Sequence, residues 1–497
     1  MAMIYLDNAA TTIQKPECVT EAVVQAMQTL GNCGRGAGKG ALSAARIIYE
    51  ARAAAARLFH LDSPKRVCFT GNSTEALNIA LFGLIGPKDH VITTELEHNS
   101  VLRPLYHLMN AGTQVSFLKA DPSGNVDVRQ MEGLIRENTK AIVCTHASNL
   151  TGNLVDIHGA GEIARRHGLL FIVDASQTAG SFPVDMERDH ISVLCFTGHK
   201  GLMGPQGTGG LCIAKGVEIR PLKMGGTGVR TYLHEQPDQY PERLEAGTLN
   251  GHGIAGLKRA MEYIQETGLE KIHEKEYDLM MRFYQGVKDV DGVTVYGDFS
   301  GDRAPIVALN LRGWDSGEAA DVLWEDFQIA VRAGAHCAPK MHEALGTKET
   351  GAVRFSFSWF NTREEADLAV AAIRQMADGE EASGDGPGLA DRMGLVTAYI
   401  QSHYREELTL EDVSGYFGVS REYFSRFFKK QMGVNFIRYV HLLRLEHIHE
   451  DIINSDDSIM AIARHHGFTN YKLFTKMFRE IYGCTPRELR KTGEEPV

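Results

Sequence analysis

The stretch LLFIVDASQ (residues 169–177) decides the fold class of the first part of the chain. Its apolar residues are followed by Asp174, which is the pattern of a buried strand that ends in an acid. A second stretch, SVLCFTGHK (residues 192–200), repeats this pattern and ends in Lys200. Because ligands bind at the carboxyl ends of parallel strands, Asp174 and Lys200 are predicted to belong to one ligand site.

Other short apolar runs alternate with helical stretches along the first 380 residues. The predicted strands are the runs at residues 67–69, 90–92, 141–144, 169–173 and 192–196. Helices are predicted over Ala41–Leu58 and Ile157–Arg166. This alternation is typical of an α/β domain with a mostly parallel sheet.

The composition indicates a globular protein with several domains. Of the 497 residues, 43% are hydrophobic and 23% are charged, which is close to the average for globular proteins. No apolar run approaches the ~18–20 residues that cross a bilayer, and the N-terminal segment lacks the basic start of a signal peptide. The eight cysteines form no C-x-x-C pair and no spacing of zinc type. We therefore expect a cytoplasmic protein without a membrane segment, a metal site or a disulfide framework.

A small, acidic and glycine-rich stretch divides the chain. Residues 378–390 are predicted to form a flexible linker, because they offer almost no large apolar side chain to a core. The net charge of −11 lies entirely within residues 1–390, since residues 391–497 contain 15 Lys and Arg and 15 Asp and Glu. We expect an α/β domain over residues 1–377 and a separate all-α domain over residues 391–497.

A third stretch of the first domain, FTGNSTEALN (residues 69–78), is a candidate phosphate site. It joins a predicted strand to a predicted helix through small residues, whose backbone N–H groups can hold a phosphate. Pyridoxal phosphate needs such a site, an acid for its pyridinium nitrogen and a lysine for its Schiff base. Each feature alone is common in other proteins. Together with Asp174 and Lys200, this stretch predicts binding of pyridoxal phosphate.

Residues 3–376 resemble the class V aminotransferase-like family, and most closely its cysteine desulfurases. The motifs that carry the resemblance are LDNAATT (residues 6–12), EHNS (97–100), SNLTG (148–152), EAGT (245–248) and VRFS (353–356). The resemblance implies the type I fold of pyridoxal-phosphate enzymes, in which a mixed, mostly parallel sheet is joined to a small α/β subdomain. It also implies a homodimer, since Thr248 matches a residue that reaches the phosphate of the partner subunit.

The resemblance further implies which residues form the site. The expected cofactor-binding residues are Ser73, Thr74, His98, Asn149, Asp174, Gln177, Thr197, His199, Lys200 and Thr248. The expected substrate-binding residues are Asn8, Arg332 and Arg354, of which Arg354 would clamp a carboxylate.

The stretch VRAGAHCAP (residues 331–339) contains the candidate nucleophile, Cys337. It is similar to the R-x-G-x-H-C loop of desulfurases and selenocysteine lyases, although Ala335 and the Pro339-Lys340 pair differ from better-known members. The neighbouring His336 and Lys340 are expected to be cations that favour the thiolate of Cys337. The alternative is a glycine-bearing turn with an incidental thiol.

The resemblance implies a mechanism for this loop. Lys200 would remove the α-proton of L-cysteine, and the Cys337 thiolate would take the sulfur as a persulfide and leave L-alanine. His98 is expected to shuttle a proton, because an imidazole titrates near neutral pH.

The C-terminal domain contains an internal repeat. FSRFFKKQMG (residues 424–433) and FTKMFREIYG (residues 474–483) match at a period of 50 residues, and each follows a helix and a glycine turn. The domain resembles the AraC-type DNA-binding domain, which implies two recognition helices, here about Arg421–Met432 and Asn470–Tyr482. The alternative is a generic helical bundle.

The two predicted recognition helices each have a core face and a DNA face. Residues expected to pack inward are Tyr423, Phe424, Phe427, Leu473, Phe474 and Phe478. Residues expected to contact double-stranded DNA are Arg421, Glu422, Ser425, Arg426, Lys429, Asn470, Tyr471, Lys472, Thr475, Lys476 and Arg479.

We therefore expect a pyridoxal-phosphate cysteine desulfurase fused to a DNA-binding regulator module, with a protein or thiol as sulfur acceptor. Two alternatives stay open from the sequence. One is a regulator that uses a desulfurase-like domain to sense a ligand, and the other is a selenocysteine lyase.

Overall fold

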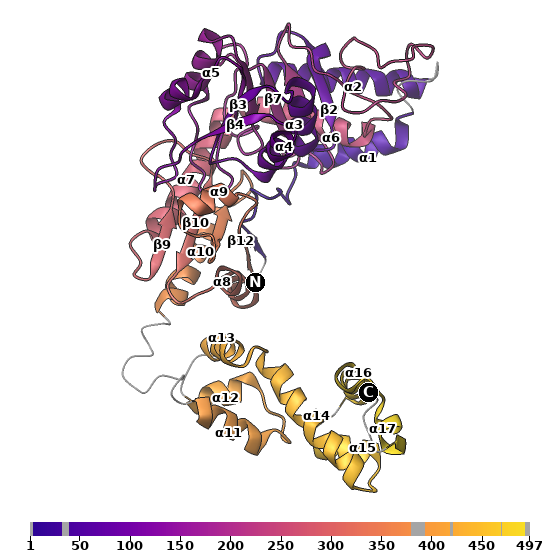
Figure 1. Ribbon diagram of the computed structural model, residues 1–497, viewed down its shortest axis with the longest axis vertical. Helices are drawn as coiled ribbons and strands as arrows, with labels where there is room; N and C mark the ends of the chain where they lie inside the picture. Colours follow the sequence, from indigo (N-terminus) through magenta and orange to yellow (C-terminus); the bar gives the residue numbers. More distant parts are fainter. Residues whose placement is uncertain (1–2, 32–38, 379–392, 418–420, 469, 493–497) are drawn as a thin grey trace. The chain divides into compact units, whose positions relative to one another are not determined.

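The structure is a computed structural model that describes residues 3–31, 39–378, 393–417, 421–468 and 470–492. The chain separates into two compact units, Met1–Ala377 and Asp378–Val497 (Figure 1). Apart from Asp378, the predicted linker lies outside the described residues. Each unit is described by itself below.

A seven-stranded sheet forms the centre of the first unit. In spatial order its strands are β2 (Val67–Thr70), β8 (Gly209–Ile213), β7 (Val193–Thr197), β6 (Leu170–Asp174), β5 (Thr139–Thr145), β3 (His90–Thr94) and β4 (Gln114–Leu118). Strand β8 runs antiparallel to both of its neighbours, and the other neighbouring strands are parallel. The prediction of a mixed, mostly parallel sheet is confirmed.

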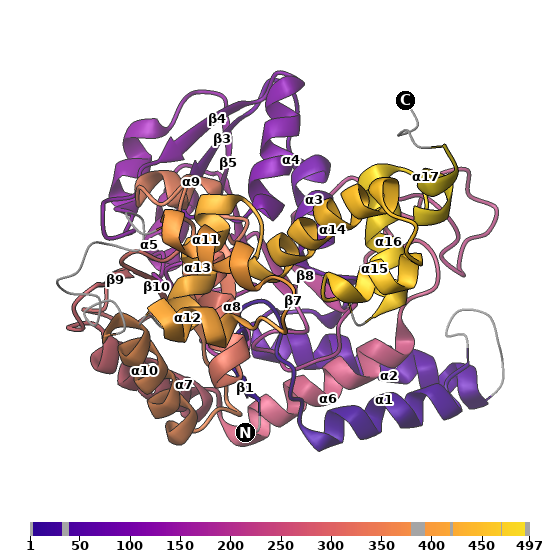
Figure 2. The same ribbon diagram turned by 90° about the horizontal axis from the view of Figure 1, so that it is seen from below.

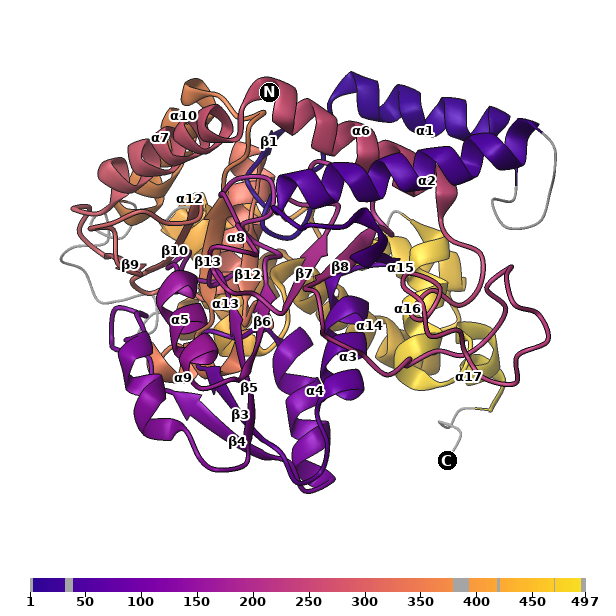
Figure 3. The ribbon, with the colours of Figure 1, turned by 90° about the horizontal axis from the view of Figure 1, so that it is seen from above.

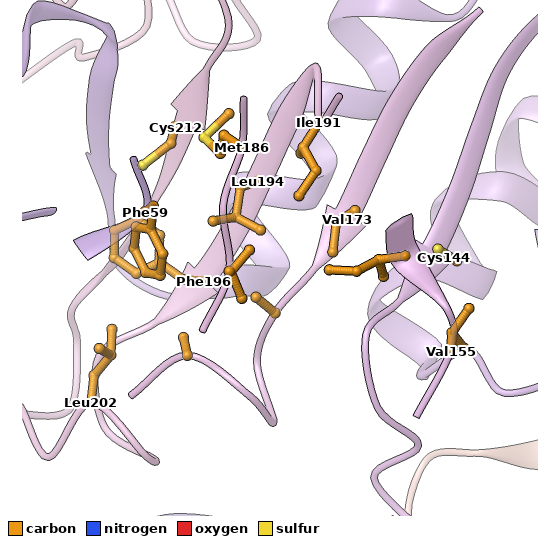
Figure 4. Close-up of a cluster of buried hydrophobic side chains, with 14 of the residues drawn as sticks. Phe59, Cys144, Val155, Val173, Met186, Ile191, Leu194, Phe196, Leu202 and Cys212 are labelled. Atoms are coloured by element: carbon orange, nitrogen blue, oxygen red, sulfur yellow. The ribbon is translucent and has the colours of Figure 1, made fainter. Parts of the chain in front are cut away.

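Both faces of this sheet are buried. In β6, Phe171 and Val173 pack into one hydrophobic cluster, whereas Ile172 packs into another. The first cluster contains Phe59 and Phe196, whose ring centroids are 5.3 Å apart (Figure 4). Burial on both faces explains why these strands appear in the sequence as continuous apolar runs.

Helices cover the sheet. Helices α1 (Glu17–Thr29) and α2 (Lys39–Leu58) lie beside α6 (Gly251–Thr267) (Figures 2 and 3). The remaining helices of this layer structure are α3 (Ser73–Leu84), α4 (Asn99–Asn110) and α5 (Ile157–Arg166), with two short 3₁₀ helices at Pro64–Arg66 and Val128–Leu134. The predicted helix Ile157–Arg166 has the predicted ends.

A smaller subdomain completes the first unit. Its antiparallel sheet contains, in spatial order, β12 (Arg332–Gly334), β13 (Ala352–Ser356), β10 (Ile306–Leu311) and β9 (Val293–Tyr296). Its helices are α7 (Leu269–Val287), α8 (Ser316–Phe327), α9 (Pro339–Ala344) and α10 (Arg363–Asp378). The N-terminal strand β1 (Ile4–Tyr5) pairs with β11 (Ile329–Ala330). This pairing brings the following residue, Leu6, beside β13, where its carbonyl accepts from the Ser356 amide at 2.7 Å.

The second unit is entirely helical where it is described. Its helices are α11 (Met393–His403), α12 (Leu410–Phe417), α13 (Arg421–Met432), α14 (Phe436–Asn454), α15 (Ile459–His465), α16 (Tyr471–Tyr482) and α17 (Pro486–Thr492). Phe424 and Phe428 lie in one core, and Phe474 and Phe478 lie in a second. Helix α14 contributes to both cores, so that it joins the two repeats (Figure 1).

One buried arginine holds the two repeats together. Arg444, in the middle of α14, donates from Nε to the Tyr404 carbonyl and from Nη2 to the Glu406 carbonyl, both at 2.6 Å. Its Nη1 donates to the Gly467 carbonyl at 2.9 Å. The guanidinium therefore joins the segment after α11 to the turn before α16.

No helix in the described ranges is long and apolar enough to cross a membrane.

Candidate active site

A cavity of about 220 Å³ lies at the carboxyl ends of β6 and β7. The predicted site residues that line it are Ser73, Thr74, His98, Asn149, Asp174, Gln177, Thr197, His199, Lys200, Arg332 and Arg354. The polar lining residues that the sequence reasoning missed are Asn72, Ser100, Thr145, Ser176 and His336. The fold therefore brings together predicted site residues that lie up to 281 residues apart in the sequence.

Asp174 ends β6 and is almost fully buried. Its Oδ1 accepts from the Ser73 hydroxyl at 3.1 Å and from the Ser176 amide at 3.0 Å. The Ser176 hydroxyl also donates to Oδ1, at 2.5 Å. These bonds fix the carboxylate and stabilise its charge. They leave Oδ2 for a cationic N–H of a ligand, which fits a pyridinium nitrogen.

Hydrogen-bond donors suited to a phosphate gather around the start of α3. Asn72 caps this helix by accepting from the Glu75 amide, and Ser73 and Thr74 form its first turn. The hydroxyl oxygen of Thr197 is buried and has no hydrogen-bond partner in the described part of the chain. A buried hydroxyl in this state fits an anionic oxygen of a ligand. Burial, with the nearby charge of Lys200, lowers the pKa of His199 to about 4.

Lys200 follows β7 inside the cavity. Burial, reinforced by the charge of Arg354, lowers the pKa of its ammonium group to about 8. Roughly a tenth of the side chains are therefore neutral amines at pH 7, and about half are neutral at pH 8. This is the form that attacks a carbonyl carbon to make a Schiff base.

His98 does not have the ordinary pKa that its predicted shuttle role assumed. It caps α4, with its Nδ1 accepting from the Ser100 amide at 3.0 Å. Burial and the charge of Lys200 lower its pKa to about 4. The imidazole is therefore neutral near pH 7 and carries its hydrogen on Nε2, so that it acts there as a hydrogen-bond donor rather than as a titrating cation.

Arg354 lies in the middle of β13 and is only 1% exposed. Its Nη2 donates to Asp7 Oδ1 at 2.7 Å, and its Nη1 donates to the Asn149 carbonyl at 2.9 Å. Arg332 is its register partner on β12. Like charges directly opposite each other repel. An anion between them would relieve this repulsion, so the pair fits the carboxylate of a substrate.

Asn8 lies beside this arginine cluster but does not line the 220 Å³ cavity. Its amide donates to the Ser356 carbonyl at 2.9 Å and to Asn361 Oδ1 at 3.1 Å. Asn8 borders a neighbouring cavity of about 30 Å³, which also contains the buried Glu276. In this structure Asn8 supports β13, and its predicted contact with a substrate stays a prediction.

Cys337 lies in the turn between β12 and α9 and is half-buried. The predicted charge on its neighbour His336 is wrong. Burial and the charge of Arg354 lower the pKa of His336 to about 3, and its Nε2 donates to the Arg332 carbonyl at 3.1 Å. The sequence gives no sign of this burial. The ammonium group of Lys340 lies 4.5 Å from the ring centre of Phe117.

Thr248 does not reach the Lys200 cavity of its own chain. It lines a separate cavity of about 640 Å³, together with parts of α2 and the segment 226–229. The preceding Glu245 anchors this segment, because its carboxylate accepts two hydrogen bonds from the buried Arg52 at 2.7 and 2.6 Å. The segment is thus held away from the site that its own subunit contains.

The exposed cations predicted to face DNA are partly described. Lys429, Lys472, Lys476 and Arg479 are exposed. The side chains of Arg421, Glu422, Tyr423 and Arg426 lie outside the described residues, whereas Ser425, Phe427 and Thr475 are half-buried.

Two expectations for α16 need correction. Leu473, predicted to pack inward, is 38% exposed. Asn470 is not part of the helix but its cap, with Oδ1 accepting from the Leu473 amide at 3.1 Å. Its oxygen is therefore occupied by the backbone. Tyr471, by contrast, is 37% exposed, as a DNA-facing side chain would be.

Comparison with known proteins gives two family matches. The class-V aminotransferase family matches residues 4–368, and a helix-turn-helix domain matches residues 413–492. A probable cysteine desulfurase from Methanothermobacter thermautotrophicus is 35% identical over 384 residues, which cover 75% of this chain and 94% of that protein. A cysteine desulfurase from Vibrio atlanticus is 32% identical and covers 75% of this chain and 92% of its own length.

Solved structures agree. The apo structure of a cysteine desulfurase from Thermococcus onnurineus superposes with a TM-score of 0.72 at 32% identity, covering 76% of this chain and 95% of that chain. The Escherichia coli cysteine desulfurase CsdA gives a TM-score of 0.69 at 28% identity, with 76% and 95% coverage. These matches cover most of the first unit, and the helical unit is additional to them.

Proposed function

The chain belongs to the cysteine desulfurases of the class-V aminotransferase family and carries a helix-turn-helix domain C-terminal to the enzyme domain, and from this premise we propose that it takes sulfur from L-cysteine onto Cys337. The single observation that carries the proposal is the cavity in which Asp174, Lys200 and Arg354 meet.

The residues of this cavity fit pyridoxal phosphate. Asp174 suits the pyridinium nitrogen, Thr197 and the start of α3 suit the phosphate, and Lys200 suits the aldehyde. When bound, this cofactor withdraws electrons from the α-carbon of an amino acid, so that its α-hydrogen becomes acidic.

The charged side chains have separate tasks around the substrate. Arg354 and Arg332 bind the carboxylate, which orients the α-carbon. Lys200 takes the α-proton on its neutral amine, since burial lowers the pKa of that group to about 8. His98 donates a hydrogen bond from Nε2 and does not have to lose its proton to do so.

Cys337 performs the sulfur step. Its thiolate attacks the substrate sulfur, so that an S–S bond forms while the carbon–sulfur bond of the substrate breaks. The electron pair of the broken bond stays with the three-carbon part, which gains protons and leaves as L-alanine. The protein is left with a persulfide on Cys337, and an acceptor protein or a small thiol would then remove the outer sulfur.

We further propose that the enzyme is a homodimer. Thr248 borders a 640 Å³ cavity of its own chain rather than the Lys200 cavity, which supports a role toward the phosphate site of a partner subunit. The proposed dimer would carry two helix-turn-helix units. Their exposed cations, including Lys472 and Arg479, support binding to the phosphates of double-stranded DNA. Because the thiolate chemistry requires reduced cysteines, we place the protein in the cytoplasm.

The test measures L-alanine and sulfide formed from L-cysteine by the full-length protein with pyridoxal phosphate and a reducing agent. Wild type and Cys18→Ser should form both products, because Cys18 lies in the first turn of α1, outside the lining of the cavity and outside the turn that carries Cys337. Cys337→Ser should form little alanine, and Lys200→Ala should lose the visible absorbance of the bound cofactor. Full activity of Cys337→Ser would refute the assigned nucleophile.

Two outcomes separate the alternatives. A protein that binds the cofactor and cysteine but forms no alanine would be a ligand-sensing regulator instead of an enzyme. Selenocysteine turnover that greatly exceeds cysteine turnover would favour a selenocysteine lyase.

A further inference from the structure

Asn149 makes contacts in three directions, although the sequence assigns it only to the cofactor. It lies in the loop between β5 and α5 and is 6% exposed. Its side-chain Nδ2 donates to the His336 carbonyl at 2.7 Å, and its own carbonyl accepts from Arg354 Nη1 at 2.9 Å. Asn149 also lines the 220 Å³ cavity that contains Lys200.

The carbonyl that Asn149 holds belongs to an unusual turn. His336 and Cys337 have φ angles of 50° and 56°, so two consecutive non-glycine residues adopt the left-handed conformation. Side chains with a Cβ rarely occupy this region, and surrounding contacts must hold them there. Two hydrogen bonds do so. Asn149 binds the His336 carbonyl, and the Asn99 amide binds the Cys337 carbonyl at 2.8 Å.

The third direction is the cofactor cavity. The Oδ1 atom of Asn149 is buried and has no hydrogen-bond partner in the described part of the chain. Leaving a buried acceptor without a donor is unfavourable. A hydroxyl group of pyridoxal phosphate in the cavity would supply such a donor. The same amide group would then be held at its oxygen by the cofactor and at its nitrogen by the Cys337 turn.

We propose that Asn149 is a positioning residue that couples the cofactor cavity to the Cys337 turn, so that binding of the cofactor stabilises the left-handed conformation of His336 and Cys337. This inference rests on the proposed function and deepens it. Through its backbone carbonyl, Asn149 also keeps Arg354 in register with the same turn. One residue thereby relates the group that would hold the substrate carboxylate to the thiol that would receive the sulfur.

The test is amide hydrogen exchange in the peptide that covers residues 332–340 of the full-length protein. Without cofactor, Asn149→Ala should exchange about fivefold faster there than wild type, the equivalent of one net hydrogen bond of about 1 kcal/mol. Addition of pyridoxal phosphate should slow exchange in wild type. It should not slow exchange in Asn149→Ala, even though the variant binds the cofactor through Lys200 with visible absorbance.

Gln177→Ala is the matched control. Gln177 lines the same cavity, but its Nε2 donates to the Ala9 carbonyl at 3.3 Å and not to the Cys337 turn. In Gln177→Ala, the exchange rate over residues 332–340 should match that of wild type without cofactor and should fall when the cofactor is added. Asn149→Asp is isosteric and replaces the Nδ2 donor with a carboxylate oxygen, which adds negative charge and cannot donate to the His336 carbonyl, so this variant should also lose the bond to the turn and serves if the alanine variant does not fold.

Two results would overturn the inference. The first is that both Asn149 variants exchange residues 332–340 at the wild-type rate without cofactor. The second is that the cofactor slows exchange over these residues equally in wild type and in the Asn149 variants. Neither result depends on turnover of cysteine. A failure of the proposed desulfurase activity is therefore distinguishable, because the measurement without cofactor still reports whether Asn149 holds the turn.

Discussion

Replacing Asp7 with asparagine should destabilise the first unit by about 3 kcal/mol. Asp7 Oδ1 lies 2.7 Å from Arg354 Nη2, and the two side chains are only 19% and 1% exposed. Asparagine keeps the shape and the acceptor oxygen but removes the negative charge. The Arg354 guanidinium then remains buried without its counter-ion and opposite the like charge of Arg332. Breaking a buried pair typically costs about 3–5 kcal/mol. The partial exposure of Asp7 favours the lower end of this range.

A bound carboxylate should restore part of this loss. L-Alanine, the proposed product, presents a carboxylate to Arg354 and so replaces the missing charge. The assay is the thermal unfolding midpoint of the full-length, cofactor-loaded protein with and without saturating L-alanine. Without L-alanine, Asp7→Asn should unfold about 5 °C below wild type. L-Alanine should raise the midpoint of the variant more than that of wild type.

The control is Asp367→Asn, which breaks an exposed pair. Asp367 lies 2.6 Å from Arg282, and their side chains are 52% and 45% exposed. Such pairs contribute about 0–1 kcal/mol, so the midpoint should hardly move. Equal midpoints for Asp7→Asn and wild type would refute the view that Asp7 neutralises a buried arginine. An equal response to L-alanine in both proteins would refute the view that the substrate carboxylate takes over this task.

Two further predictions concern a buried acid and a DNA contact. Burial raises the pKa of Glu276 from 4.5 to about 7. The protonated form of Glu276 therefore stabilises the folded protein fully below about pH 4.5, and this stabilisation is lost as the pH rises through about 7. The total loss in the free energy of unfolding is roughly 3 kcal/mol. Glu276→Gln should therefore unfold at the wild-type temperature at pH 5 and at a higher temperature at pH 8, and parallel pH profiles would contradict this. Arg479 is exposed and lies near the end of α16, so it is expected to contact a DNA phosphate. Arg479→Ala should therefore weaken binding to operator and random duplexes equally and reduce the slope of log affinity against log salt concentration by about one. The measurement is binding to both duplexes at several salt concentrations, and a loss of affinity for the operator alone would contradict the phosphate contact.

The sequence predicted the central strands well because burial on both faces leaves a local signal. Strands β6 and β7 are apolar runs, and Asp174 and Lys200 end up at the expected edge. Strand β8 carried no such signal, since it begins with Gly209 and Gly210, which are poor strand formers. The fold requires glycine there, because a Cβ on Gly210 would lie 2.6 Å from the Cys68 carbonyl oxygen.

The protonation states of the site histidines could not be predicted from the sequence. His98 was recognised as a site residue and His336 as a neighbour of Cys337, but their neutral state follows from burial and from the nearby charges of Lys200 and Arg354. Those surroundings arise only when distant segments meet. The pairing of β1 with β11, which places Asp7 beside Arg354, is a contact of this kind. Sequence motifs and the family resemblance therefore predict which residues belong to the site, and long-range packing decides their protonation states and hydrogen-bond partners.

The link between the two helical repeats sets a rule for the DNA that this unit would recognise. Helix α14 has 19 residues, which at about 1.5 Å per residue gives a rod of roughly 28 Å. Arg444 donates to three backbone carbonyls in the two repeats, and these bonds restrict rotation of the second repeat relative to the first. The separation of the two predicted recognition helices, α13 and α16, is therefore built into the protein, and the two halves of a site on one face of a duplex lie about one turn, ~34 Å, apart. An operator for this unit would tolerate base substitutions one at a time, but a single inserted base pair between its halves would move one half out of reach.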